Sequence, residues 1–309
     1  MSPAARVSDI GTVEEGPLSA VLAALARDDP GGVVAALDGQ LHHGRPGSPA
    51  ALRQQVGERL AVALAKQSSR ASRWIETLAS APSPTARQVA CLLLASRYPE
   101  DPGMVLRTAE QLAEDPHWEV REAAGGLLGT LLDRDFERIR GRLETLRSSR
   151  SENLRRAVVL AVKYAARRDK PKRVPDLLQL LQPMLRDEES DVRRNLGAHT
   201  LGDALLRVDP KETLRALREW SKDRDPMVRW NVAMAFSSAI GSFHWPAAKS
   251  ILERLAKGPE PLVRNAVAKA MRRCRQRYTE EVEETRLRWL NDRDRSATAV
   301  LMGPLKKRA

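Results

Sequence analysis

Apolar residues recur along most of the chain at spacings of three and four, which is the period of an amphipathic helix. After residue 225, for example, they stand at Val228, Val232, Ala235 and Phe236. The sequence shows no run in which β-branched and polar residues alternate, so we expect no sheet. The pattern predicts an all-α protein.

One short phrase returns along the chain, and each copy is expected to start a helix. It has an acidic or proline-containing turn, an aliphatic residue and then an arginine. The copies are PHWEVRE (116–122), SENLRR (151–156), ESDVRRN (189–195), DPMVRWN (225–231) and EPLVRN (260–265), with a weaker SPTARQ at 83–88. The marker arginines, spaced by 34, 34, 38, 36 and 35 residues, are Arg87, Arg121, Arg155, Arg193, Arg229 and Arg264. This period is typical of stacked helix pairs.

The repeats predict an α-solenoid of HEAT-like units, a right-handed superhelix with a concave basic groove. We expect a disordered N-terminus over 1–16, a diverged helical cap over 17–80, HEAT-like repeats over 81–276, and a C-terminal helix with a basic tail over 277–309. Cap helices are expected at Leu18–Leu25 and Ala51–Leu64, and a final helix after Arg277 that runs to about Leu290. Partner helices are expected at Pro102–Ala113, Arg134–Leu146, Arg173–Leu185, Lys211–Trp220 and His244–Leu255.

The marker arginine itself is expected to be structural. In repeats of this kind it ties one unit to the next through an acid or a carbonyl. Asp115, Asp187 and Asp225 precede the markers and can cap a helix, while proline fits the first helical turn because its missing N–H costs nothing there.

The net charge of the chain indicates what kind of partner it binds. The chain carries 52 basic and 40 acidic residues, a net charge of +12. The excess is concentrated in residues 201–309, which favours a polyanion such as nucleic acid or an anionic surface. A basic protein without a polyanion partner is the alternative.

Two cysteines, Cys91 and Cys274, lie in apolar helical patterns and form neither a disulfide framework nor a metal site. The sequence has no stretch of 18 apolar residues and no secretory signal. We therefore expect a cytoplasmic, nucleoid-associated protein, monomeric, with no metal, cofactor or membrane partner.

Aligning the repeats on the marker arginine shows which residues break a column. Trp230 follows its marker in a column that is otherwise polar, and Trp118 is the odd residue three positions before its marker. Each is expected either to be an apolar plate that binds something, or to pack under a neighbouring loop.

A second break holds an acid. His199 and Asp203 stand four residues apart in columns that are mainly apolar or small in the other repeats. An acid in an apolar row must be paired, neutralised or functional. The alternative to function is a His199–Asp203 hydrogen bond within the stack.

The ordered series WEVRE (118–122), SENLRRA (151–157), SDVRRNLGAHTLGD (190–203) and VRWNVAMAFS (228–237) resembles the HEAT-like-repeat DNA glycosylases of the AlkC and AlkD type, and is closer to AlkC. The resemblance covers roughly residues 80–275. It implies an enzyme that cuts the N-glycosidic bond of cationic N3- and N7-alkylpurines in duplex DNA. It also implies a monofunctional mechanism without base flipping, which would admit bulky adducts, including those of DNA-alkylating genotoxins.

The resemblance assigns residues as well. Glu119 and Asp203 match the catalytic acids of the AlkC pattern, and Tyr164 stands nearest to its sugar-contacting aromatic residue. With His199, Trp118 and Trp230, Tyr164 would contact the sugar or the lesion. Carboxylates suit this chemistry because they stabilise a sugar that becomes oxocarbenium-like.

Asp203 stands one residue later after its marker than the AlkC pattern has its acid. At roughly 100° per residue, positions two before and nine after a marker share a helix face to about 20°, whereas two before and ten after differ by about 120°. Asp203 would therefore point away from the direction of Glu119 in an ideal helix. A bulge or kink in the glycine-containing helix at Gly197 and Gly202 would restore its aim.

Double-stranded DNA would be held by phosphate contacts from second helices and their ends. The candidates are Arg156, Lys163, Arg167, Arg168, Arg194, Arg272 and Arg273. For the run RRDKPKR (167–173), a solvated loop is the alternative.

Two other functions fit the pattern. A non-catalytic HEAT adaptor that binds nucleic acid or a protein would use Trp118 and Trp230 as contacts and needs no acid in the apolar column. A lyase-type or regulatory HEAT protein that acts on a protein partner fits the basic last third less well.

Overall fold

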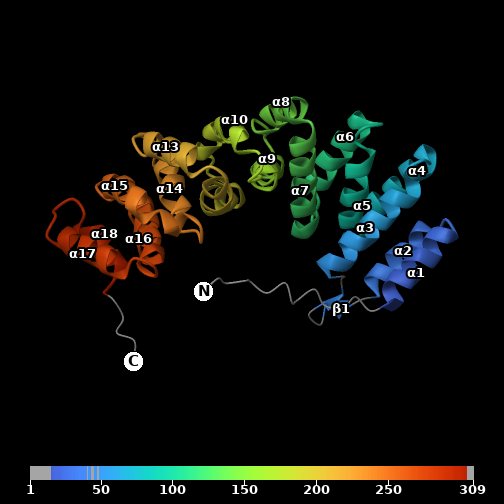
Figure 1. Ribbon diagram of the computed structural model, residues 1–309, viewed down its shortest axis with the longest axis horizontal. Helices are drawn as coiled ribbons and strands as arrows, with labels where there is room; N and C mark the ends of the chain where they lie inside the picture. Colours follow the sequence, from blue (N-terminus) through green and yellow to red (C-terminus); the bar gives the residue numbers. More distant parts are fainter. Residues whose placement is uncertain (1–14, 40, 43–44, 47–48, 305–309) are drawn as a thin grey trace. The chain divides into compact units, whose positions relative to one another are not determined.

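The computed structural model describes residues 15–39, 41–42, 45–46 and 49–304 (Figure 1). The expected disorder over 1–16 and the basic tail LKKRA fall mostly or wholly outside these residues. The chain divides into two compact units, Met1–Leu131 and Leu132–Ala309. Each is described by itself.

The first unit is helical. Its helices are α1 (Glu15–Ala26), α2 (Pro30–Asp38), α3 (Ala50–Leu64), α4 (Ser68–Ser80), α5 (Pro84–Arg97), α6 (Pro102–Ala113) and α7 (Trp118–Arg134), the last of which continues into the second unit. The expectation of no sheet is wrong in one detail, because β1 (Leu41–His42) pairs antiparallel with β2 (Arg45–Pro46). Two-residue strands are too short to leave an alternating pattern in a sequence.

Asp28 ties the first helices of this unit together. It lies in the turn between α1 and α2 with a positive φ of 56°, which aspartate tolerates better than most residues. Its Oδ1 accepts hydrogen bonds from the Trp74 indole Nε1 at 2.7 Å and from Arg70 Nε at 2.6 Å, and Oδ2 pairs with Arg73. These three bonds fasten the α1–α2 turn to α4.

The second unit continues the helix pairs. Its elements are α8 (Phe136–Leu146), α9 (Glu152–Ala165), η1 (Pro171–Arg173), α10 (Val174–Leu181), η2 (Gln182–Arg186), α11 (Ser190–Arg194), η3 (Asn195–Leu205), α12 (Leu206–Val208), α13 (Pro210–Trp220), α14 (Pro226–Ala235), η4 (Gly241–His244), α15 (Trp245–Leu255), α16 (Pro261–Arg275), α17 (Thr279–Leu290) and α18 (Ser296–Met302).

These elements form two layers. The first helices of the pairs, α8, α10, α13 and α15, contact one another in sequence, and so do the second helices α9, η3, α14 and α16. The apolar series of α14 faces the interior, since Val228, Val232, Ala235 and Phe236 are all buried. With the HEAT-repeat pattern, this arrangement makes the chain an α-solenoid. Its handedness and the concave basic groove stay predictions.

Three of the six marker arginines bind an acid of the following repeat, as expected. Arg87 binds Asp115 at 2.6 Å, and Arg155 binds Asp187 at 2.6 Å. Arg229 binds Glu260 at 2.5 Å, again an acid of the following repeat.

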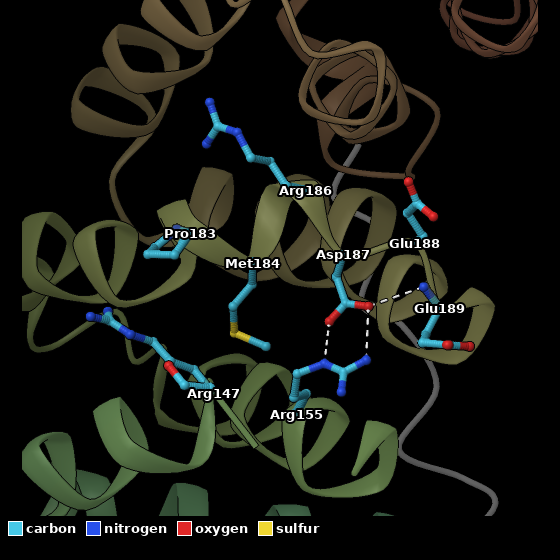
Figure 2. A pocket seen from close by; sticks show the side chains of 9 residues that line it. Arg147, Arg155, Pro183, Met184, Arg186, Asp187, Glu188 and Glu189 are labelled. Atoms are coloured by element: carbon cyan, nitrogen blue, oxygen red, sulfur yellow. Dashed lines mark hydrogen bonds and ion pairs between the residues drawn. The ribbon is translucent and has the colours of Figure 1, made fainter. Parts of the chain in front are cut away.

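Figure 2 shows one of these seams, a polar hollow of 380 Å³ at Arg155 and Asp187. Asp187 serves twice, because its Oδ1 also accepts the Glu189 backbone N–H at 3.0 Å. The Arg155 guanidinium further donates to the Ser149 carbonyl at 3.0 Å. Burial and pairing of this kind make Arg87, Arg155 and Arg229 parts of the fold rather than of a binding surface.

Candidate active site

The helix that carries His199 and Asp203 is a π-helix, η3. Its hydrogen bonds reach back five residues instead of four, as the Leu206 N–H does to the Leu201 carbonyl. A π-helical turn takes up one more residue than an α-helical turn, so a side chain one position late turns back towards the α-helical direction. The bulge that the late position of Asp203 requires is therefore present.

Glycines allow η3 to lie against α14 more closely than side chains would permit. A Cβ atom at Gly202 would stand 2.3 Å from the Ala235 carbonyl oxygen, and one at Gly197 would stand 2.8 Å from the Met234 Cβ. Gly241, after α14, approaches the same Ala235 carbonyl. This close backbone contact fixes where the η3 side chains emerge.

The two oxygens of Asp203 have different neighbours. Its Oδ1 accepts the Ile240 backbone N–H at 2.9 Å, which holds the segment that follows α14. Its Oδ2 lies 3.9 Å from His199 Nδ1, too far for a hydrogen bond. The structural alternative of a His199–Asp203 hydrogen bond is thus wrong, and the bond that positions Asp203 is one to the backbone.

Asp203 and His199 open into a hollow of 590 Å³ between α11, η3, α14 and α16. Its lining combines an acid, an imidazole, an indole and four cationic side chains. The lining residues are Ser190, Arg193, Arg194, Ala198, His199, Asp203, Trp230, Met234, Ser237, Ser238, Ala239, Lys269 and Arg273. Five residues singled out from the sequence, Asp203, His199, Trp230, Arg194 and Arg273, therefore meet in one pocket.

Trp230 is not the exposed plate that its polar column suggested. It is half-buried, and the Arg193 guanidinium lies over its ring, 5.2 Å from the centroid. Trp230 packs against Arg193 and also lines the pocket. The two alternatives for this residue, packing and binding, therefore each hold in part.

Two cations of this pocket were missed by sequence reasoning. Arg193 was taken as one more structural marker, and Lys269 gave no signal because it stands among many basic residues of α16. Their proximity becomes visible only when α11 and α16 are placed around the same hollow.

The other predicted acid, Glu119, lies in the first unit, in the first turn of α7. Burial lowers the pKa of Arg53 on α3, while the negative charge of Glu119 raises it. Glu119 thus has a cationic neighbour that the sequence did not suggest. Trp118, next to it, is 60% exposed, so it does not pack under a loop.

Tyr164 and Lys163 lie together at the end of α9. The Lys163 ammonium stands over the Tyr164 ring, 4.5 Å from its centroid, and Tyr164 is 45% exposed. Arg156, on the same helix, is only 8% exposed. A buried guanidinium is poorly placed for a phosphate on the surface, so its predicted DNA contact loses support.

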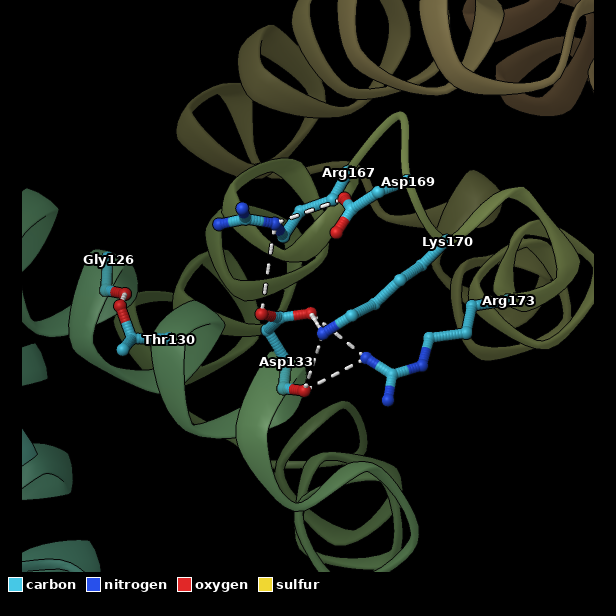
Figure 3. A network of polar contacts seen from close by, with 7 residues as sticks. All are labelled: Gly126, Thr130, Asp133, Arg167, Asp169, Lys170 and Arg173. Carbon is cyan, nitrogen blue, oxygen red and sulfur yellow. Dashed lines mark hydrogen bonds and ion pairs between the residues drawn. The ribbon is translucent and has the colours of Figure 1, made fainter.

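Cations of the basic loop after α9 gather around Asp133, near the end of α7 (Figure 3). Lys170 and Arg173 bind the Asp133 carboxylate at 2.5 and 3.0 Å, and Arg167 lies 3.9 Å from it. Arg168 is exposed. The solvated-loop alternative therefore does not describe Lys170 and Arg173, which are held by Asp133, whereas the Arg167 side chain is 56% exposed.

At the other end of the unit, Arg272 and Arg273 differ. Arg272 donates to the Leu301 carbonyl at 2.7 Å and so fastens α18, whereas Arg273 lines the pocket and donates to Gln276 at 2.6 Å.

Burial raises the pKa of both thiols, Cys91 and Cys274, to about 12, which leaves them protonated and unreactive.

A family model for DNA alkylation repair enzymes matches residues 47–199, and one for HEAT repeats matches residues 184–272. The chain belongs to the HEAT-like-repeat DNA glycosylase superfamily. The matching family model is described as that of DNA alkylation repair enzymes. The match does not separate the AlkC from the AlkD branch, so closeness to AlkC stays a prediction.

Solved structures with similar chains include a mutant of Kap121p, with 10% identity, a TM-score of 0.48 and coverage of 96% of this chain and 33% of that one. The chain thus spans about a third of that protein's length. YibA of Escherichia coli has 17% identity, a TM-score of 0.37 and coverage of 85% and 100%. An engineered protein has 16% identity, a TM-score of 0.31 and coverage of 93% and 80%. No curated protein matches the chain.

In the part of the chain that the structure describes, no helix is long and apolar enough to cross a membrane. Within the same residues, no group of three or more histidine, cysteine, aspartate or glutamate side chains could hold a metal ion.

Proposed function

We propose that the protein is a monofunctional DNA glycosylase that removes cationic N3- and N7-alkylated purines from duplex DNA. The observation that carries the proposal is the pocket on η3, where Asp203 shares a 590 Å³ hollow with Trp230 and four cations. An acid, an aromatic face and phosphate-binding groups are the three components that this reaction needs.

The chemistry asks little of a proton donor. The N-glycosidic bond breaks with its electron pair going to the purine, which thereby loses its positive charge. C1′ becomes electron-deficient, and a carboxylate beside it stabilises that charge. Water then adds to C1′ and gives up a proton, which leaves an abasic site.

Each side chain has a role in this scheme. Asp203 stabilises the sugar cation and orients water, with its Oδ1 fixed by Ile240 N–H. Trp230 supplies an aromatic face for the cationic base, and Arg194, Lys269 and Arg273 hold phosphates. Glu119 and Trp118 of the first unit are assigned to the same reaction by the AlkC-like pattern.

The decisive experiment is base release. Purified protein is incubated with duplex DNA that has been methylated, and free alkylpurine and alkali-labile abasic sites are measured over time, with unmethylated duplex and Asp203→Asn as controls. Release by the natural chain at a rate well above the Asp203→Asn rate supports the proposal. Tight binding of DNA without release would instead favour the non-catalytic adaptor.

A further inference from the structure

Arg193 differs from the marker arginines Arg87, Arg121, Arg155 and Arg229 in what its terminal nitrogens contact. Those of Arg87, Arg155 and Arg229 bind an acid of the next repeat, and Arg121 Nη1 donates to the Asp115 carbonyl at 2.8 Å. Arg193 Nη1 has only the Met227 sulfur at 3.6 Å. Among the residues that the structure describes, no acid lies within ion-pair distance of it.

The acid at the equivalent position of the next repeat, Asp225, already binds other groups. Asp225 stands 32 residues after Arg193, as Asp187 does after Arg155. Its carboxylate accepts the Met227 N–H at 2.8 Å and lies 3.5 Å from Arg186 Nε. Arg193 therefore forms no ion pair with the next repeat, and its side chain lines the pocket instead.

In the pocket, the Arg193 guanidinium lies over the Trp230 ring. A flat cation above an indole is held by the negative face of the ring. A cationic alkylpurine that stacks on Trp230 would use the same interaction. Arg193 and such a base therefore compete for one aromatic face.

The same guanidinium is poorly satisfied where it lies. Its Nε is buried without a hydrogen-bond partner, as are those of Arg121 and Arg229, but its Nη1 in addition faces only a sulfur, which is a weak acceptor. A phosphate oxygen would be a much better partner, because charge-assisted hydrogen bonds are roughly twice as strong as neutral ones. Arg194, Lys269 and Arg273 around the same hollow would attract a phosphate to it.

We propose that Arg193 is a placeholder for the substrate cation. In the free protein it covers Trp230, and when duplex DNA binds, its guanidinium turns to a backbone phosphate and uncovers the ring. Access to the aromatic face is thereby coupled to engagement of DNA. The identity of the entering cation rests on the proposed function, but the exchange of Arg193 between ring and phosphate does not.

The test uses two ligands. One competes with Arg193 for the Trp230 ring, and the other supplies the phosphates that Arg193 would bind. The first is N7-methylguanosine in mildly acidic buffer, a cationic nucleoside without phosphate, with guanosine as the neutral control. The second is undamaged duplex DNA. Binding of both is measured for the natural chain, Arg193→Gln and Arg193→Lys, with tryptophan fluorescence for the nucleoside and Trp230→Leu to identify the signal.

Arg193→Gln is expected to bind the cationic nucleoside about fivefold to tenfold more tightly and duplex DNA about tenfold more weakly. Arg193→Lys should keep most of the DNA affinity and still bind the nucleoside more tightly, since lysine lacks the flat face. Arg155→Gln, which breaks a structural ion pair, should lower the melting temperature and leave the ratio of the two affinities unchanged.

Opposite changes in the two affinities support the placeholder, even if no variant releases base, in which case only the proposed function fails. Changes of the same sign in the two affinities of Arg193→Gln overturn it. An unchanged affinity for the cationic nucleoside in a folded Arg193→Lys variant also overturns it.

Discussion

At the scale of single residues, the two oxygens of Asp203 have separate duties. Oδ1 accepts the Ile240 N–H, and Oδ2 lies 3.9 Å from His199 Nδ1 in a side chain that lines the pocket. Substitutions can therefore separate the charge of this side chain from its structural bond.

Asp203→Asn keeps an acceptor for Ile240 and removes the charge. We expect single-turnover base release to fall on the order of 10²-fold while the melting temperature stays within about a degree. Asp203→Ala removes the acceptor as well and should also destabilise the fold by about 1 kcal/mol. A folded Asp203→Asn variant with the natural excision rate would remove Asp203 from the mechanism.

Glu119→Gln tests the acid of the first unit in the same assay. The expected loss is again about 10²-fold in base release. Affinity for undamaged duplex should be unchanged or slightly higher, because a negative charge near phosphate is removed. Glu122→Gln, one turn further on the same helix, is the matched control and should release base at the natural rate. Equal rates for both variants would leave Glu119 without a catalytic role.

Residue-scale inference from the sequence succeeded where a side chain broke a column and failed where it did not. Asp203, His199 and Trp230 each differ from their columns and lie in one pocket. Arg193 stands in a column of arginines, so nothing in the sequence marks it. Its difference comes from the Asp225 carboxylate being held by other groups, which is a property of three-dimensional packing.

At the scale of elements, helix positions followed closely from the repeat. Helix α6 has the predicted bounds, and α13 and α15 begin within one residue of theirs. Helices α2, α4 and α18 were missed. The glycines near the start of α2 weaken a helical pattern, although Pro30 at its first turn and the Asp29 cap are start signals. The π-helix was foreseen only as a required bulge, because its hydrogen-bond pattern depends on the contact with α14.

Gly202→Ala tests that contact. A methyl group there would overlap the Ala235 carbonyl and the Ser238 hydroxyl, so we expect destabilisation of about 1–3 kcal/mol and a loss of base release. Gly141→Ala in α8, where a Cβ meets nothing within 4 Å, is the control and should stabilise the protein by about 0.5–1 kcal/mol. Denaturant unfolding measures both. Stabilisation by Gly202→Ala would contradict the close packing of η3.

The tie between the α1–α2 turn and α4 should depend on pH. Hydrogen bonds from Trp74, Arg70 and Arg73 hold the pKa of Asp28 well below its ordinary value of 3.8. A carboxyl with a lowered pKa in the folded state contributes its full stability above the ordinary value and loses it as the pH falls towards the folded-state pKa. Melting temperatures of the natural chain and Asp28→Asn should therefore differ by a constant amount from about pH 7 to 5 and converge below about pH 4. A difference that widens in acid would disprove the tie.

At the scale of the whole molecule, the net charge of +12 predicts DNA binding that weakens with salt and has little sequence preference. The residues that carry it can be tested with a matched pair. Arg194 in the pocket and Arg215 on α13 have similarly exposed side chains, at 73% and 71%.

Arg194→Gln should lower the slope of log affinity against log salt by roughly 1, and Arg215→Gln should leave it unchanged. Titrations with undamaged duplex at several salt concentrations provide the slopes. Equal slopes for the two variants would place the phosphate contacts elsewhere on the molecule.

The glycine contacts between η3 and α14 make the pocket insensitive to salt. Three other seams of the array include an arginine–acid pair, which ionic strength can screen. The seam between η3 and α14 has no such pair: it is closed by glycines in van der Waals contact and by the hydrogen bond from Ile240 N–H to Asp203. A salt dependence of base release would therefore report the encounter with DNA rather than a deformation of the pocket.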